Sequence, residues 1–470
     1  MYHITPIVIS IFAVALFYLS CIEGAPVDHS ELFLTPLIKS GDLAKAKELS
    51  ADHMKDFHIK SSTNENLKSF TGYLTVNDTA NSNLLSSQDA TETFSSNVPA
   101  LETPEKAPVI MWLNEVAGSS CLKGVFLENG PFYVDDNLEL RDREFTWVRK
   151  YSLLYLDVPV GSGFSFTDKE DGYAKNSEDD ADEVFEALQQ FFTLFSEFQA
   201  LDLYFAGEGA SANHIPRMVK RVEAGNKEEK LKINLKGFMV GSPFVNMKFQ
   251  AKFSNSWFNM GLIDEEQRKE VEDVENKIQS LIQEKKLEEA HVELFKLIIV
   301  PNTLYSKFTG HVGQQLNYLN GTDPPVLTNF AKFIDNKEVH NYLHVGLHKF
   351  EILNFKVHDK FRSEIMAGDG KAMEAVLDNY KVLIYSCQMD PAVVHSQVTK
   401  TVEAFEWSGA AELKKAPRKI WKVGDDVAGF VKSVGKFHYV MLRKTGRYAA
   451  MDQPAWAFEM VQNFIDDIPF

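Results

Sequence analysis

The chain alternates short apolar runs with segments in which apolar residues recur every three or four positions. Five runs rich in β-branched and aromatic residues predict strands. They span residues 109–113, 152–156, 203–206, 237–240 and 382–385. These runs are apolar at nearly every position, which is typical of strands buried on both faces. The segments 184–195 and 215–222 between them have helical spacing. The pattern therefore predicts an α/β fold with a mostly parallel sheet flanked by helices.

The alternation stops at about residue 245 and resumes after residue 375. Within this block, Asp264 opens a long charged segment whose apolar positions keep a helical period. Because the block interrupts the sheet pattern, we predict that it is an inserted helical cap. The two parts of the sheet domain are then residues 69–244 and 376–470, with the cap at 245–375.

The N-terminus has the pattern of a signal peptide. Residues Ile4 to Leu19 are almost wholly apolar, and the small residues Gly24 and Ala25 follow. The run is shorter than the ~20 residues that a membrane span needs, although a retained signal anchor is the alternative. We predict that residues 1–24 are removed and that the mature chain has no membrane span. The mature chain is then expected to be secreted, with a lysosome-like compartment as the other destination.

The segment after the signal peptide is open to two interpretations. Residues 25–68 are polar and charged, as in an N-terminal arm or pro-segment, but a mobile tail would look the same. A strand pair is predicted to begin near Phe70, and the Ser-, Thr- and Asn-rich stretch 80–105 is predicted to be a loop. The sequons at Asn77 and Asn320 are predicted to carry glycans once the chain is secreted.

Composition excludes several classes of function. The 470 residues are 44% hydrophobic and carry a formal net charge of −17. No basic run of the kind that binds a phosphate backbone occurs, so no nucleic-acid partner is expected. No cluster at metal-ligand spacing and no phosphate-binding glycine loop occurs, so no metal or cofactor is expected. Removal of the signal peptide leaves Cys121 and Cys387, and the sequence leaves open both their pairing and the oligomeric state.

The most informative segment is a strand followed by Gly-Glu-Gly-Ala-Ser-Ala-Asn-His, within Leu203–Pro216. It resembles the serine carboxypeptidases, especially their vitellogenic carboxypeptidase-like branch, in which a strand runs into Gly-Glu-Ser-Tyr-Ala-Gly. Three further motifs of that family lie in Trp112–Ser120, Phe126–Pro131 and Asp157–Ser165. The resemblance runs from about Phe70 to the C-terminus. It implies an α/β-hydrolase fold whose nucleophile sits on a tight strand-to-helix turn.

Two of the three catalytic positions implied by the resemblance hold other residue types. Gly209 stands where the family has its serine, and Arg447 stands where it has its histidine. Asp390 keeps the position of the orienting acid. A glycine offers no nucleophile, and a guanidinium stays protonated, so it cannot accept a proton. We hypothesise that Arg447 instead forms an ion pair with Asp390.

The resemblance also implies which residues surround these positions. The oxyanion-hole positions are Val116 and Ala210, and the positions that bind a peptide carboxylate are Asn114, Glu128 and Glu208. Two close carboxylates that share a proton can hold a peptide C-terminus. The alternative is that they are buried, mutually hydrogen-bonded groups without a ligand. Ser211 and His214, on the helix after the turn, are interpreted as ordinary helix residues.

These observations predict a secreted homologue of the serine carboxypeptidases that lacks peptidase activity and acts by binding. Its expected ligand is a peptide C-terminus, a protein partner or a small metabolite held under the cap. One alternative is an active carboxypeptidase or acyltransferase that uses a different nucleophile. Another is an abundant secreted glycoprotein whose pocket has no function.

Overall fold

The computed structural model describes residues 31–53, 67–91, 106–228, 230–298, 302–314, 316–368 and 370–470. The predicted signal peptide, residues 1–24, lies outside these residues. So do residues 25–30 and 54–66 of the predicted arm and residues 92–105 of the predicted loop. None of the helices in the described ranges is long and apolar enough to cross a membrane.

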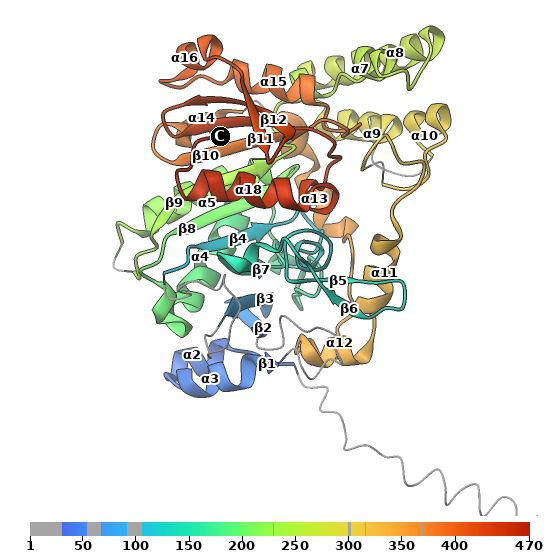
Figure 1. Ribbon diagram of the computed structural model, residues 1–470. Helices are drawn as coiled ribbons and strands as arrows, with labels where there is room; N and C mark the ends of the chain where they lie inside the picture. The colour runs from blue at the N-terminus through green and yellow to red at the C-terminus, as the bar shows by residue number, and fades with distance from the viewer. Residues whose placement is uncertain are drawn as a thin grey trace, which may run out of the picture.

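The described residues form one large sheet (Figure 1). Its eleven strands lie in the order β1-β2-β3-β7-β4-β8-β9-β10-β13-β12-β11. They are β1 (Ala51–His53), β2 (Leu67–Asn77), β3 (Ser82–Thr91), β4 (Val109–Leu113), β7 (Ser152–Leu156), β8 (Leu203–Glu208), β9 (Leu235–Gly241), β10 (Lys381–Cys387), β11 (Lys419–Val423), β12 (Asp426–Val434) and β13 (Phe437–Leu442). A separate antiparallel pair consists of β5 (Phe132–Val134) and β6 (Leu140–Asp142).

The centre of the sheet is parallel and its two edges are antiparallel. Strands β7, β4, β8, β9, β10 and β13 run parallel to one another. At one edge β1, β2 and β3 pair antiparallel with each other and with β7, and at the other edge β11 and β12 do so with β13. The five predicted strands correspond to β4, β7, β8, β9 and β10, so the prediction of a mostly parallel sheet is confirmed.

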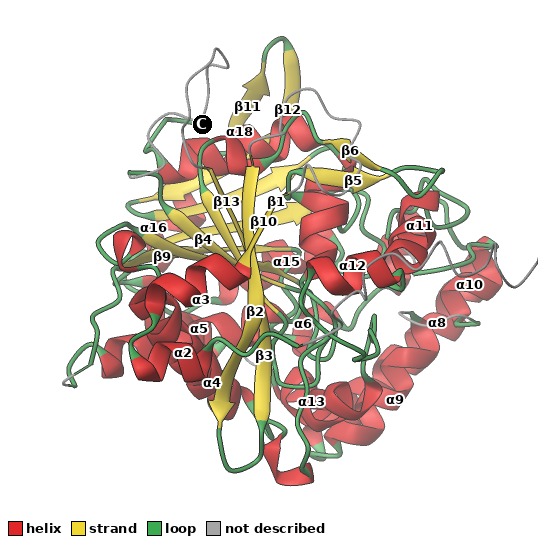
Figure 2. Cartoon of the chain, turned by 90° about the horizontal axis from the view of Figure 1, so that it is seen from below, coloured by secondary structure: helices red, strands yellow, loops and turns green. Residues whose placement is uncertain are grey.

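Helices cover both faces of this sheet and fill the connection between β9 and β10 (Figures 1 and 2). They are α2 (Thr35–Ser40), α3 (Leu43–Ser50), α4 (Ser177–Leu194), α5 (Ser211–Gly225), α6 (Met247–Gln250), α7 (Ser254–Asn259), α8 (Glu265–Gln283), α9 (Leu287–Leu297), α10 (Leu304–Thr309), α11 (Pro325–Ile334), α12 (Lys337–Tyr342), α13 (Phe355–Ala367), α14 (Lys371–Leu377), α15 (His395–Ala404), α16 (Ala410–Lys415), α17 (Ala449–Asp452) and α18 (Pro454–Ile465).

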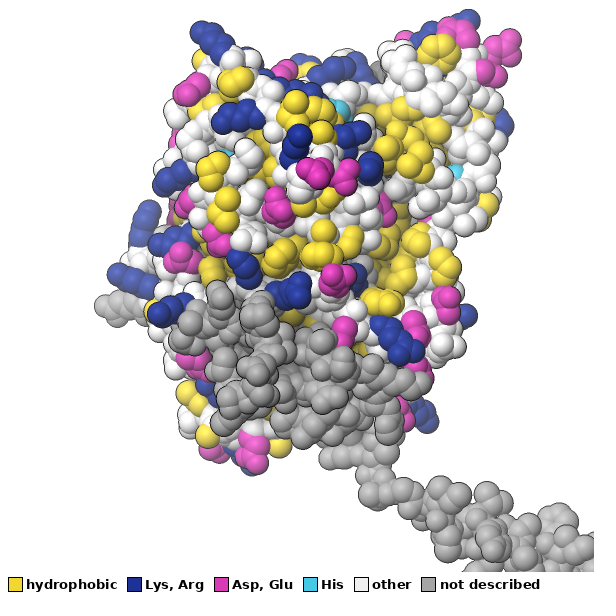
Figure 3. Space-filling model, in the orientation of Figure 1, with side chains coloured by type: hydrophobic (Ala, Val, Ile, Leu, Met, Phe, Trp, Pro, Cys, Tyr) yellow, Lys and Arg dark blue, Asp and Glu magenta, His cyan; other side chains and the backbone are white. Residues whose placement is uncertain are grey.

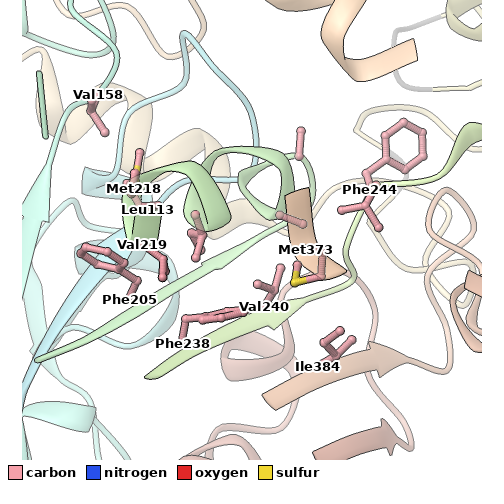
Figure 4. Close-up of a cluster of buried hydrophobic side chains, with 14 of the residues drawn as sticks. Leu113, Val158, Phe205, Met218, Val219, Phe238, Val240, Phe244, Met373 and Ile384 are labelled. Carbon is pink, nitrogen blue, oxygen red and sulfur yellow. The ribbon is translucent and has the colours of Figure 1, made fainter. Parts of the chain in front are cut away.

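Side chains alternate across the strands and build two cores. In β8, Leu203 and Phe205 join one buried cluster with α4 and α5, whereas Tyr204 and Ala206 join another with α18. Figure 4 shows the first cluster, in which Phe205 and Phe238 from the sheet lie beneath Met218 and Val219 of α5. Because both faces are covered, the strands need apolar residues at successive positions, which explains the continuous apolar runs in the sequence.

The segment between β9 and β10 contains α6 to α14 and no strand longer than a single bridge among its described residues. Asp264 caps the N-terminus of α8, where its side chain accepts a hydrogen bond from the Gln267 N–H in a capping box. Helix α8 packs against α9, and α9 packs against α13. Figures 1 and 2 show α8, α9 and α10 at one side of the molecule, away from the sheet strands.

The predicted loop 80–105 is wrong at its start, because Ser82–Thr91 forms strand β3. Strand β3 pairs with β2 on one side and with β7 on the other, which satisfies its backbone groups. Ser86 and Ser87 are buried in it although they are polar. A stretch rich in serine has the composition of a loop. Composition alone therefore did not predict this strand.

The sequence left open the structure of the N-terminal arm and the pairing of the two cysteines. Helices α2 and α3 pack on α4 and β2, and Leu34 and Ala46 are buried in the main core. Cys121 and Cys387 are both buried free thiols and do not form a disulfide. The Cys121 thiol lies 3.2 Å from a carboxylate oxygen of Asp157.

Candidate functional site

The candidate site lies at the carboxyl ends of the parallel strands. Glu115 follows β4, Gly209 follows β8, Asp390 follows β10 and Arg447 follows β13. In open α/β sheets these ends meet at one edge, where ligands bind. Glu115, Val116, Gly209, Ala210 and Arg447 line a single cavity of about 350 Å³. The tertiary structure therefore brings together segments that are separated by up to 332 residues in the sequence.

Gly209 forms the tight turn between β8 and α5. Its φ is +58°, in the left-handed region that favours glycine. Its N–H donates to the Gly241 carbonyl at 2.9 Å, and its own carbonyl accepts from the Phe244 N–H at 2.9 Å. This is the strand–turn–helix arrangement that the resemblance implies, with no side chain at its tip.

The backbone of Glu115 occupies the space in front of Gly209. A Cβ atom added at Gly209 would lie 2.7 Å from the Glu115 carbonyl oxygen, which is closer than such atoms approach in proteins. The same carbonyl accepts a hydrogen bond of 2.7 Å from the Ala210 N–H. One of the two predicted oxyanion-hole donors is thus already bonded within the protein. The other position, Val116, is half-buried and lines the cavity.

Arg447 lies between two buried carboxylates. Its Nε is 3.6 Å from Oδ2 of Asp390, and its Nη1 is 3.5 Å from Oε2 of Glu115. The hypothesised pair with Asp390 is present as an ion pair, in which Nε of Arg447 and Oδ2 of Asp390 make no hydrogen bond among the described residues. Glu115 is a second partner that the sequence did not indicate. Burial opposes the charge on Arg447, but Asp390 and Glu115 outweigh it and raise the pKa of the guanidinium.

Glu115 is held in place by three side chains. Its Oε1 accepts from the Tyr448 hydroxyl at 2.7 Å and lies 3.2 Å from Nζ of Lys123. Burial acts to raise the pKa of Glu115, but Lys123, Arg447 and Tyr448 together lower it to about 2. The other carboxylate, Asp390, accepts the N–H groups of Ala392 and Val393 at 2.8 and 2.9 Å. We call Glu115, Lys123, Asp390 and Arg447 the charge cluster.

The predicted carboxylate-binding residues do not line the same cavity as Gly209 and Arg447. Glu208 ends β8 and accepts the Tyr385 hydroxyl at 3.0 Å, and Glu128 ends the π-helix Gly124–Glu128. Burial raises the pKa of both glutamates, and their mutual proximity raises that of Glu208 further. Neither residue lines the 350 Å³ cavity, whose lining includes Glu115. Asn114 lines a separate small recess beside Asp180 and His214.

Replacing Glu128 with glutamine is expected to weaken the dependence of stability on pH. Folding raises the pKa of Glu128 from 4.5 to about 8, so between these pH values the folded chain keeps a proton that the unfolded chain loses. The free energy of unfolding therefore falls as the pH rises through this range. We expect the loss between about pH 5 and pH 8 to shrink by roughly 1–3 kcal/mol in Glu128→Gln. Urea unfolding at both pH values measures this, with the exposed Glu144→Gln as the control that should change nothing. An unchanged pH dependence in Glu128→Gln would contradict the raised pKa.

The structure places Ser211 and His214 outside the cavity. The Ser211 hydroxyl donates to the Glu208 carbonyl at 2.7 Å, and His214 bonds to the carboxylate of Asp180. Both residues are buried. No group of three His, Cys, Asp or Glu residues in the described part of the chain is arranged to hold a metal ion.

Four residues of the site were missed by sequence reasoning. Lys123 and Tyr448 complete the surroundings of Glu115, and His291 and His358 face the same cavity from α9 and α13. The two histidines are far apart in the sequence, and no spacing rule connects them. Lys123 and Tyr448 stand beside recognised motifs, but a single lysine or tyrosine there does not by itself indicate a functional residue.

The parallel sheet, the tight turn after β8 and the residues gathered beyond the strand ends define an α/β hydrolase. The sequence matches the family model described as serine carboxypeptidase over residues 60–467. It is 34% identical over 442 residues to a human protein named probable serine carboxypeptidase CPVL, covering 92% of this chain and 89% of that protein. It is 33% identical over 450 residues to the venom serine carboxypeptidase of Apis mellifera, covering 93% and 92% of the two chains.

A solved structure supports the same fold. The prohormone-processing carboxypeptidase KEX1(DELTA)P from Saccharomyces cerevisiae superposes with a TM-score of 0.73 at 19% identity, covering 90% of this chain and 95% of that one. The protein belongs to the serine carboxypeptidase family. The predictions of the family and of the α/β-hydrolase fold are confirmed.

Proposed function

We propose that this chain is a catalytically inactive serine carboxypeptidase homologue that acts by binding a ligand in the cavity beneath the cap. The observation that carries the proposal is that the turn after β8 has no side chain at its tip and no room for one. Gly209 supplies no nucleophile, and the Glu115 carbonyl fills the space where one would stand. Arg447, at the position of the base, is an ion-paired cation that cannot accept a proton.

Other parts of the proposal concern processing and location. We propose that residues 1–24 are a signal peptide, that the mature chain enters the secretory route, and that 245–375 forms the cap. Asn77 and Asn320 are both exposed, as a glycan acceptor must be. Glycans at these two positions are therefore compatible with the fold.

Labelling with a fluorescent serine-directed phosphonate tests the proposal. We expect the purified protein to remain unlabelled, because Ser211 donates its hydroxyl proton to a backbone carbonyl and lies outside the cavity. An active serine carboxypeptidase labelled in parallel is the control. Stoichiometric labelling that maps to a serine of this chain would favour the alternative, an active carboxypeptidase with another nucleophile.

A further inference from the structure

Half of the residues that line the cavity beside Gly209 belong to the cap. Helix α9 contributes His291, Leu294 and Phe295, and α13 contributes Phe355 and His358. Helix α13 also contributes Ile365, and the rest of the apolar wall consists of Val116, Ala210, Phe244, Ile298, Ile352, Leu353, Ala392 and Val393. A volume of about 350 Å³ with apolar walls falls in the range of sites that hold small molecules. The lining is too apolar for the backbone of a bound peptide to find many hydrogen-bond partners.

The cavity opens to solvent beside two of its lining residues. Phe355 is 54% exposed and Ile352 is 36% exposed, although both also face the interior. Figure 3 shows hydrophobic side chains gathered below the lobe that carries α8, α9 and α10, where the surface is hollowed. An apolar molecule therefore meets exposed apolar side chains at this part of the opening, where Lys356 is the exposed charged neighbour of Phe355.

The floor of the cavity is electrically balanced. Two cations, Lys123 and Arg447, are paired with two carboxylates, Glu115 and Asp390, over 3.2 to 3.6 Å. A ligand carboxylate would add a negative charge for which no free cation remains among these four residues. Burying a charge without a partner is costly, so the charge cluster disfavours an anionic ligand. A peptide C-terminus is such a ligand.

The polar groups of the lining outside the charge cluster are Ser119, Gln314, His291 and His358. The two histidines are 3% and 4% exposed, and their ring centroids lie 5.2 Å apart. Neither ring nitrogen of His358 makes a hydrogen bond of ordinary geometry among the described residues, although the Ala117 backbone lies near enough to the ring to act on its pKa. Burial, followed by the charge of the neighbouring imidazole, lowers the pKa of His291 to about 3, and burial lowers that of His358. At neutral pH each imidazole is therefore uncharged and carries one N–H donor.

We propose that the cavity binds an uncharged, apolar molecule with one hydrogen-bond acceptor oxygen, which accepts from the ring N–H of His358. The inference rests on the proposed function, because it assumes that the cavity binds and does not cleave. The apolar wall holds the body of the ligand. The acceptor oxygen gives a buried imidazole a hydrogen bond of ordinary geometry, which none of the described residues supplies, and buried polar groups are rarely left without one.

A matched set of three ligands tests this assignment: methyl decanoate, decanoate and decane. All three have the same ten-carbon chain. Methyl decanoate adds a neutral acceptor, decanoate adds a charged acceptor, and decane has no acceptor. We expect the dissociation constant at about pH 7 to be roughly tenfold lower for the ester than for decanoate and roughly fivefold lower than for decane. Isothermal titration calorimetry and ligand-induced thermal stabilisation measure the three values.

Two variants at His358 separate recognition from packing. His358→Phe is expected to lower the affinity for the ester to that for decane, whereas His358→Gln, which keeps a donor, retains the preference. If either variant fails to fold, the comparison of the three ligands on the natural chain decides alone. Equal or tighter binding of decanoate or of an N-blocked dipeptide, or no binding of the ester, would overturn the ligand class. Release of methanol from the ester at an enzymatic rate would instead contradict the proposed function.

Discussion

A Gly209→Ser, Arg447→His double variant is expected to hydrolyse blocked dipeptides no faster than the natural chain between about pH 4 and pH 8. The natural chain itself is expected to be silent, because loss of the serine or the histidine typically lowers turnover by roughly 10⁶. Restoring both residue types does not restore the site. The new serine Cβ would meet the Glu115 carbonyl at 2.7 Å, and the Ala210 N–H would remain bonded to that carbonyl.

Adding Glu115→Gly to the double variant provides the matched comparison. The Glu115 side chain fixes its loop through Tyr448, Lys123 and Arg447, so glycine frees the carbonyl to move away from the turn. We expect measurable hydrolysis in this triple variant only, followed as release of the C-terminal amino acid. Enzymatic rates in the double variant would show that the Glu115 backbone does not block the site. Enzymatic rates in the natural chain would contradict its proposed inactivity.

Arg447→Met is expected to lower the free energy of unfolding by about 3–5 kcal/mol, because it leaves two buried carboxylates without their shared cation. The side chains of Asp390 and Glu115 are only 0% and 13% exposed, so solvent cannot replace the guanidinium. Urea unfolding at neutral pH measures the change. The exposed Arg149→Met is the control and should stay within about 0.5 kcal/mol of the natural chain.

Neutralising the carboxylates as well distinguishes the cause. An Arg447→Met, Asp390→Asn, Glu115→Gln variant is expected to recover part of the lost stability, because no uncompensated carboxylate remains in the cluster. Lys123 then loses its closest partner, which limits the recovery. If Arg447→Met is as stable as the natural chain, Arg447 is not a structural replacement for the catalytic histidine.

Much of the sheet could be predicted, and the reason lies in local pattern. Strands such as Val109–Leu113 and Ser152–Leu156 are almost wholly apolar and are buried at every position, as a sheet covered on both faces requires. Strand β3 could not be predicted, because its Ser-rich sequence becomes a strand through pairing with β2 and β7. The antiparallel hairpin of β11 and β12 has alternating exposure and polar residues, so its apolar signal is weak.

The sequence by itself determined the fold class and the residue types at the candidate catalytic positions. Whatever the packing, Gly209 has no nucleophilic atom and Arg447 has no lone pair to accept a proton, because these are properties of single side chains. The tertiary structure decided what surrounds them. It placed the Glu115 carbonyl against Gly209, left Glu128 and Glu208 outside the cavity, and brought His291 beside His358. Such contacts join residues distant in the chain, and their energies depend on separation and burial, which only the packed fold sets.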